Sequence, residues 1–267
     1  MGGIEPHRFT MKIYEKYMKN NLFNYTLRLA DNALILGHRL SEWCGHAPIL
    51  EQDIALSNIA LDLIGQARSL YQYAAEVQNE GKTEDDLAYL RDVWDFQNCL
   101  LVEQPNGDFA VTIVRQFLFS AFALPAYQKL AQSSDETLRG VAEKAVKEVA
   151  YHLRWSSEWT IRLGDGTEES AKRTQAAVNQ LMPYVGELTE ADALENWANT
   201  EGVGVDLLAV RNIQNQTIEA VFAQAKLQKP ASNWQQSGGK TGQHSEHLGY
   251  ILADMQFLQR AYPNSTW

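Results

Sequence analysis

The spacing of apolar residues constrains the fold most, because it follows the period of an α-helix over most of the chain. Between residues 23 and 44 the apolar positions recur at intervals of four and three: Leu29, Ala33, Leu36, Leu40 and Trp43. Residues spaced in this way share one face of a helix. Almost no stretch shows the alternation of apolar and polar residues that is typical of a half-buried strand. The sequence therefore predicts an all-α protein.

The predicted helices differ in length, and this difference indicates the architecture. Long helices are expected over residues 23–44, 50–80, 109–132 and 136–163, and a shorter helix is expected over 85–101. Further helices are expected over 168–187, 190–200, 206–227 and 245–262, with a loop over 228–243. Four long helices with a long crossover after the second are the layout of ferritin-like proteins. The prediction is a ferritin-like four-helix bundle with additional C-terminal helices.

Length and composition limit the number of domains. A chain of 267 residues has room for one large domain or two small ones. No linker divides the helical pattern, so we expect residues 23–267 to form a single helical domain. Residues 1–22 are expected to be an N-terminal extension, either disordered or a remnant of cloning.

Charge and cysteine usage exclude several classes of protein. The formal net charge of −10 offers no basic surface for nucleic acid. Two cysteines cannot form a disulfide framework and fit a reducing compartment. No uninterrupted apolar run reaches the roughly 18 residues of a membrane span, and the N-terminus lacks the apolar core of a secretory signal. We therefore expect a cytoplasmic protein that binds neither nucleic acid nor membrane.

A bundle of this kind can be tested for a di-iron site. Such a site needs a Glu from each of two helices and Glu-x-x-His from each of the other two. In the helix over 50–80 there is no His, and Gly65 follows Asp62 where the His is needed. In the helix over 136–163, Val149 precedes His152 where the Glu is needed. The helix over 109–132 contains no carboxylate, so the sequence predicts no metal site, only remnant positions.

The remnant positions have alternative interpretations. His152 lies on the apolar face of its helix and is expected to be a core histidine satisfied by a polar neighbour. Asp62 shares a helical row with Asn58 and Gln66, which either form a buried polar network or face solvent or a partner. Glu148 is rotated about 100° away from the apolar face and is not expected to replace the missing acid.

A glycine-rich segment, residues 238–249, is the most unusual local run. It contains Gly-Lys-Thr, but Trp234 stands where a phosphate-binding loop needs Gly, and no strand precedes it. His244 and His247 could share a metal with Glu246 nearby, and Lys240 could bind an anion. The remaining alternative is a loop that fixes the last helix against the bundle or a neighbouring subunit.

Several stretches together resemble a known family. They are LGHRLSEWCGHAP at 36–48, DLIGQAR at 62–68, LVEQPNG at 101–107, KEVAYHLR at 147–154, HSEHLG at 244–249 and MQFLQR at 255–260. Over residues 24–267 the chain resembles the family of C subunits (PaaC) of bacterial phenylacetyl-CoA epoxidases, which are multicomponent monooxygenases.

The resemblance implies a function and a set of partners. In that family the A subunit carries di-iron and epoxidises the ring of phenylacetyl-CoA, while a small B subunit and a flavin/iron–sulfur reductase complete the system. The C subunit is implied to pair with the A subunit and stabilise it, to be non-catalytic and to hold no cofactor, and it could self-associate when alone. No metal ligand of the family can be carried over to Gly65 or Val149. Contact with CoA or the reductase stays open.

Three other interpretations compete with the subunit hypothesis. A self-sufficient di-metal oxidoreductase with an unusual ligand set predicts bound iron in the isolated chain. An iron-storage protein needs acidic ferroxidase ligands that the predicted helices lack. A generic scaffold would show no preference for an oxygenase subunit.

Overall fold

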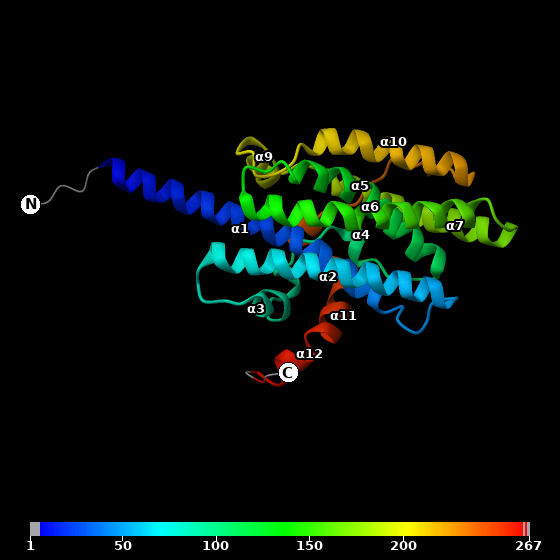
Figure 1. Ribbon diagram of the computed structural model, residues 1–267, viewed down its shortest axis with the longest axis horizontal. Helices are drawn as coiled ribbons and strands as arrows, with labels where there is room; N and C mark the ends of the chain where they lie inside the picture. The colour runs from blue at the N-terminus through cyan, green and yellow to red at the C-terminus, as the bar shows by residue number, and fades with distance from the viewer. Residues whose placement is uncertain (1–5, 264, 266–267) are drawn as a thin grey trace, which may run out of the picture.

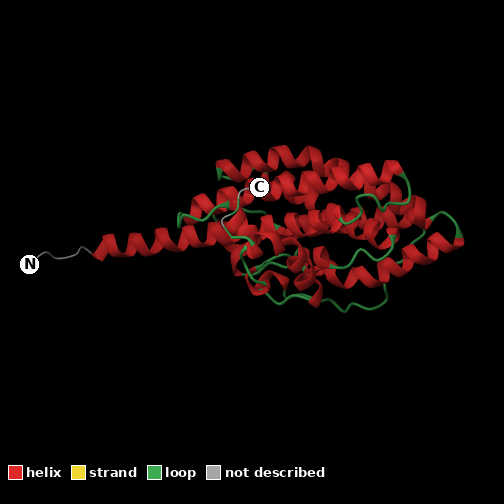
Figure 2. Ribbon diagram, turned by 90° about the horizontal axis from the view of Figure 1, so that it is seen from below, coloured by secondary structure: helices red, strands yellow, loops and turns green. Residues whose placement is uncertain are grey.

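Four long helices form the body of the molecule. The computed structural model describes the backbone of residues 6–263 and 265, and side chains from residue 16 onward. The long helices are α1 (Pro6–Ser41), α2 (Leu50–Gln78), α5 (Phe109–Leu130) and α6 (Glu136–Gly164). Helix α1 packs along α2, α5 packs along α6, and α2 also contacts α6 (Figure 1). The prediction of an all-α bundle is confirmed, since the described residues contain no strand (Figure 2).

Shorter helices surround this body. Before α5 come α3 (Glu84–Tyr89), η1 (Val93–Asp95) and α4 (Leu100–Glu103). After α6 come α7 (Glu168–Leu181), η2 (Met182–Tyr184), α8 (Val185–Leu188), α9 (Ala193–Thr200) and α10 (Leu207–Ala225). The chain ends with η3 (Gly239–Thr241), α11 (Glu246–Met255) and α12 (Phe257–Ala261). Helices α7 and α10 cover α5 and α6, whereas α11 and α12 form an arm that projects from the bundle (Figure 1).

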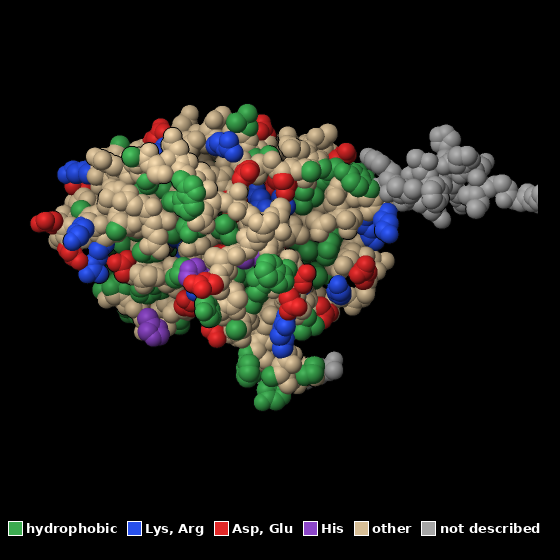
Figure 3. Space-filling model, turned by 180° about the vertical axis from the view of Figure 1, so that it is seen from behind, with side chains coloured by type: hydrophobic (Ala, Val, Ile, Leu, Met, Phe, Trp, Pro, Cys, Tyr) green, Lys and Arg blue, Asp and Glu red, His purple; other side chains and the backbone are tan. Residues whose placement is uncertain are grey.

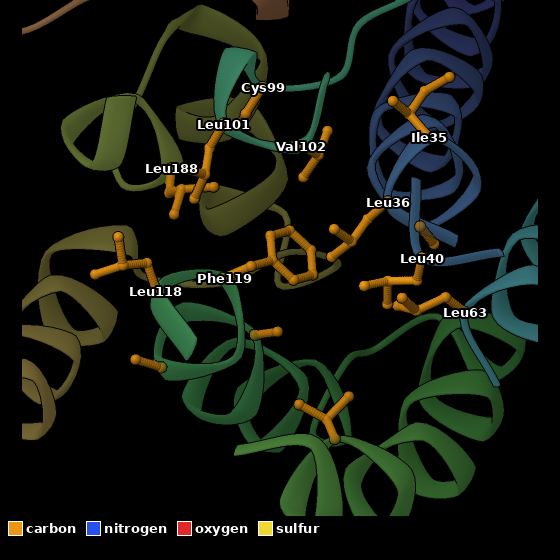
Figure 4. Packing of buried hydrophobic residues seen from close by; sticks show 14 of the residues in the cluster. Ile35, Leu36, Leu40, Leu63, Cys99, Leu101, Val102, Leu118, Phe119 and Leu188 are labelled. Atoms are coloured by element: carbon orange, nitrogen blue, oxygen red, sulfur yellow. The ribbon is translucent and has the colours of Figure 1, made fainter. Parts of the chain in front are cut away.

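Helix α5 is the most apolar of the long helices and supplies much of the core. Phe117 and Leu118 are fully buried, and the ring of Phe119 points toward Leu36 and Leu40 of α1 (Figure 4). The helix is long and apolar enough to span a membrane by composition, yet 78% of its most apolar window is buried inside the protein. The burial explains the composition, because a helix that is apolar all round is expected in a core.

Helix α1 begins earlier than the sequence predicted. We expected a start at residue 23, but the helix begins at Pro6 and projects beyond the bundle (Figure 1). Proline is favoured at the first position of a helix, where its missing N–H is no loss, and no Gly or Pro interrupts residues 7–36. Residues 6–22 are therefore helical, and residues 1–5 of the predicted extension lie outside the described residues.

The predicted single helix over 85–101 is wrong. The chain there forms α3, η1 and α4, because buried side chains of α1 hold its backbone. Asp31 is fully buried and accepts hydrogen bonds from the Gln97 backbone N–H (2.8 Å) and from Arg91. Asn32 accepts the N–H of Cys99 at 2.8 Å. These contacts replace the backbone hydrogen bonds that a continuous helix would make.

Other boundaries also differ from the prediction. Helix α7 ends at Leu181, and η2 follows because Pro183 cannot continue a helix. Helix α9 begins at Ala193, with Asp192 as its N-cap. The predicted last helix divides at Gln256, whose side-chain amide donates to the Arg91 carbonyl at 2.9 Å. At the last two of these boundaries a polar side chain contacts a neighbouring element, since Asp192 also accepts a hydrogen bond from Arg28 of α1.

Candidate functional site

Two polar pairs join α2 to α6 at the remnant metal positions. His152 is 1% exposed, and its Nε2 donates to Oδ2 of Asp62 over 3.0 Å. One turn away, Gln66 Nε2 donates to Oε2 of Glu148 over 2.9 Å. Each helix contributes two residues at an i, i+4 spacing, which places both side chains on the same face. His152 is thus a buried histidine with a polar partner, as expected.

The sequence did not predict the role of Glu148. Its position on the helix lies away from the apolar face. Its side chain nevertheless reaches Gln66 and is only 19% exposed. The signal that was present is its position four residues before His152, matching the four-residue separation of Asp62 and Gln66. Two helices that run antiparallel bring such pairs opposite each other.

The other two remnant positions supply no ligand. The Val149 side chain is 1% exposed in the apolar core, and a Cβ built at Gly65 would meet no atom within 4 Å. Across the described residues there is no group of three or more His, Cys, Asp or Glu side chains that could hold a metal. The donors present therefore do not fit a di-iron centre, which needs about four carboxylates and two imidazoles.

Lys240 of the glycine-rich segment is engaged in a buried ion cluster. Its Nζ lies 3.2 Å from Oε1 of Glu195 and donates to the Glu190 carbonyl at 2.8 Å. Arg28 of α1 binds the same Glu195 carboxylate at 3.1 Å and Asp192 at 2.8 Å. This arrangement leaves Lys240 tied to a carboxylate of α9, so its charge is already balanced within the chain.

Glu187 receives the backbone of the glycine-rich segment. Its carboxylate accepts the N–H of Gly238 at 2.8 Å and the N–H of Leu100 at 2.6 Å. Gly239 passes so close to the Asn98 carbonyl that a Cβ would overlap it. The glycine at this position is therefore required by the close approach of two backbone segments.

Glu103 is the second buried carboxylate that holds the segment. It is fully buried, and it accepts His244 Nδ1 at 2.9 Å, the Ser245 N–H at 2.7 Å and Asn98 Nδ2 at 3.0 Å. The other ring nitrogen of His244 lies 2.8 Å from the Phe96 carbonyl. Both nitrogens therefore face acceptors, which is the arrangement that favours imidazolium.

The remaining residues of this motif are not gathered around His244. Glu246 is exposed in the first turn of α11, and His247 is half-buried. Because both nitrogens of His244 already have partners, the structure does not bring together the His244 and His247 metal site that the spacing allowed. The glycine-rich segment instead links α11 to α4 through Glu103.

The protonation of His244 predicts a pH dependence. Burial alone lowers the pKa of His244, but the hydrogen bond and charge of Glu103, the Phe96 carbonyl and the Asp31 carboxylate raise it above its usual 6.5. Asp31 is itself paired with Arg91. A group with a raised folded-state pKa stabilises the protein fully below its unfolded pKa and loses this contribution as the pH rises through the folded pKa.

We therefore expect hydrogen exchange of residues 238–262 to accelerate as the pH rises above about 6.5, beyond the intrinsic increase in exchange rate. The measurement is exchange at several pH values, corrected for intrinsic rates and compared with residues 113–118 of α5. His244→Gln should remove the additional pH dependence. An unchanged dependence in this variant would contradict the assignment of an imidazolium.

Comparison with known proteins identifies the family. Residues 10–267 match the family model described as "Phenylacetic acid catabolic protein". The chain belongs to this family. The match begins earlier than residue 24, where we expected the resemblance to start, and includes most of α1.

A curated relative matches along its whole length. It is the C subunit of the 1,2-phenylacetyl-CoA epoxidase of Escherichia coli (strain K12). The chain is 48% identical to it over 248 residues, which are 93% of this chain and 100% of the relative. At this identity the two proteins are expected to share one fold, and the resemblance inferred from the sequence motifs is confirmed.

Proposed function

We propose that this chain is the non-catalytic C subunit of a cytoplasmic phenylacetyl-CoA epoxidase, and that it pairs with and stabilises the di-iron catalytic subunit during aerobic phenylacetate breakdown. The observation that carries the proposal is the full-length similarity to the C subunit of such an epoxidase, together with the incomplete ligand set between α2 and α6. The chain would hold no cofactor of its own, and the B and reductase subunits would complete the system.

The polar pairs between α2 and α6 support a structural role. A ferritin-like catalytic subunit uses the interior of its bundle for metal ligands, whose carboxylates must remain available. Here Asp62 is paired with His152, and Glu148 with Gln66, so these groups join two helices of the chain. Hydrogen bonds between side chains of two neighbouring helices help to fix how those helices pack.

Exposed apolar side chains support a partner. Leu50, Ile54 and Leu61 are 72%, 52% and 66% exposed, and their spacing places them on the outer face of α2. The inner face of α2 is also apolar and packs in the core. Large apolar side chains that are exposed close together mark contact surfaces between proteins, so we propose the part of the outer face of α2 that carries these three residues as a contact with the catalytic subunit.

The projecting arm offers a second apolar surface. Tyr250, Phe257 and Tyr262 are 67%, 62% and 56% exposed on or next to α11 and α12. Apolar side chains gather on this arm where it extends below the bundle (Figure 3). We propose that the arm contacts a further subunit, or a second copy when the chain is alone.

Iron content separates this proposal from a self-sufficient di-metal oxidoreductase. The chain purified alone from iron-supplemented cells should contain far less than one iron by elemental analysis, because the ligand set is incomplete. Val149→Glu should not change this value, since α5 contains no carboxylate and Gly65 supplies no ligand. About two irons per chain, in either protein, would contradict the proposal.

A reconstitution experiment tests the positive part of the proposal. The catalytic subunit with its B and reductase partners should epoxidise phenylacetyl-CoA and remain soluble when this chain is added. Without the chain we expect loss of activity or aggregation of the catalytic subunit. Equal activity with and without the chain would contradict a stabilising role.

A further inference from the structure

A small cavity lies inside the bundle and is not used by the proposed function. Its volume is about 50 Å³. Its walls are mainly hydrocarbon from three long helices: Leu29 and Ala33 of α1, Leu63 of α2, and Phe119, Phe122 and Ala123 of α5. Leu63 and Phe119 lie on opposite sides of the packed interior between these helices (Figure 4).

The charged residues at one end of this cavity are already paired. Arg28 and Lys240 both contact Oε1 of Glu195, at 3.1 and 3.2 Å. Two buried polar atoms of the wall residues, Arg28 Nε and Gln66 Oε1, have no hydrogen-bond partner among the described residues. One is a donor from α1 and the other an acceptor from α2, so the wall offers no set of like ligands for an ion.

The size and lining of the cavity define the ligand that it fits. A cavity of about 150 Å³ lined by aliphatic and aromatic residues binds benzene or xenon, and the present one has roughly a third of that volume. An aromatic ring is therefore too large. We infer that this cavity is a binding site for a small non-polar molecule, of the size of xenon or dioxygen. Such a molecule gains dispersion contacts with the hydrocarbon part of the wall and leaves water, which is favourable for a non-polar surface.

The structure also gives the cavity a partly open wall. Leu29 of α1, and Phe122 and Ala126 of α5, line the cavity and are only half-buried. A small gas molecule can reach the interior by side-chain motion at these positions, which occurs on short timescales.

Xenon is the probe for this site. Crystals of the full chain pressurised with xenon should show an anomalous peak between Leu63, Phe119 and Ala123, and the methyl resonances of Leu63 should shift with xenon pressure. Ala123→Val should reduce the xenon affinity at least tenfold, because its added methyl groups occupy the cavity. Ala150→Val, on the exposed face of α6, is the matched control and should leave binding unchanged.

A second variant and a second probe keep the test decisive. Ala33→Val fills the same cavity from α1 and replaces Ala123→Val if that variant is poorly folded. Dissolved dioxygen should enhance relaxation of the Leu63 methyl protons in the original chain and not in the filled variant. Equal xenon binding in filled and original proteins would overturn the inference, as would ordered waters bound to Gln66 Oε1 and Arg28 Nε that xenon does not displace. The chain alone is sufficient, so this result is independent of the reconstitution experiment.

Discussion

Replacing Glu103 by alanine is expected to lower the free energy of unfolding by about 3–5 kcal/mol, the usual cost of removing one partner of a buried ion pair. The Glu103 side chain is fully buried against an equally buried His244. In the variant, the His244 imidazolium loses its carboxylate, and the Asn98 amide and Ser245 N–H lose an acceptor. Each of these losses leaves a polar group that folding has removed from water.

The measurement is urea unfolding of the original chain and the variant, followed by hydrogen exchange of residues 238–262. Exchange should accelerate first in this segment, because Glu103 joins it to α4. Glu103→Gln keeps the side-chain volume and one acceptor, so it should lose less stability than Glu103→Ala. Its loss relative to the original chain measures the contribution of the negative charge. Glu246→Ala, at an exposed position next to His244 and Ser245 in the sequence, should change stability by less than about 0.5 kcal/mol. Equal effects of Glu103→Ala and Glu246→Ala would contradict the assigned role of Glu103.

Leu61→Glu is expected to weaken binding to the catalytic subunit by more than about 30-fold, as for the loss of an interface residue worth about 2 kcal/mol. The physical reason is that a carboxylate would be transferred from water into an apolar contact on the outer face of α2. Stability of the isolated chain should change by less than about 0.5 kcal/mol, since Leu61 is 66% exposed.

Leu208→Glu is the matched control for this experiment. Leu208 is 64% exposed, but it lies on α10, on the other side of the bundle from α2 (Figure 1). Both variants are measured by sedimentation with the catalytic subunit and by epoxidation in the reconstituted system. If Leu61→Glu binds as tightly as Leu208→Glu, the outer face of α2 is not the interface. If epoxidation is equally fast with and without the chain, the stabilising role itself is wrong, whatever the variants bind.

Part of the candidate site could be predicted from the sequence alone. His152 was recognised on the apolar face of its helix, and Gly65 and Val149 were recognised at positions where ligands are needed. The pairing of His152 with Asp62 required the structure, because the two residues are 90 positions apart. From its position on the helix, Glu148 was not expected to face the interior. Its side chain is long enough to contact Gln66 from that position. Side-chain length therefore limited what helical spacing alone could decide.

The buried carboxylates were not visible in the sequence. Glu103 and Glu187 sit in short helices with no repeating pattern, and their partners lie far along the chain in the glycine-rich segment. A glutamate that holds a loop looks the same in a sequence as one that faces solvent. The unusual composition of the segment did indicate a constrained loop, and its partners became evident only from distances.

The sequence by itself determined the helical class, the four long helices and the absence of a complete set of metal ligands at the expected positions. These properties depend on periodicity and residue type over short spans, where the helix repeat fixes which side chains share a face. The tertiary structure decided where the crossover over 85–101 breaks, which acids are buried and where the cavity lies. Those properties depend on contacts between segments far apart in the chain. For example, the Gln97 N–H donates to the Asp31 carboxylate of α1 instead of to a backbone carbonyl of the predicted helix. A local pattern cannot determine them, because burial by a distant segment changes the energy of each polar group.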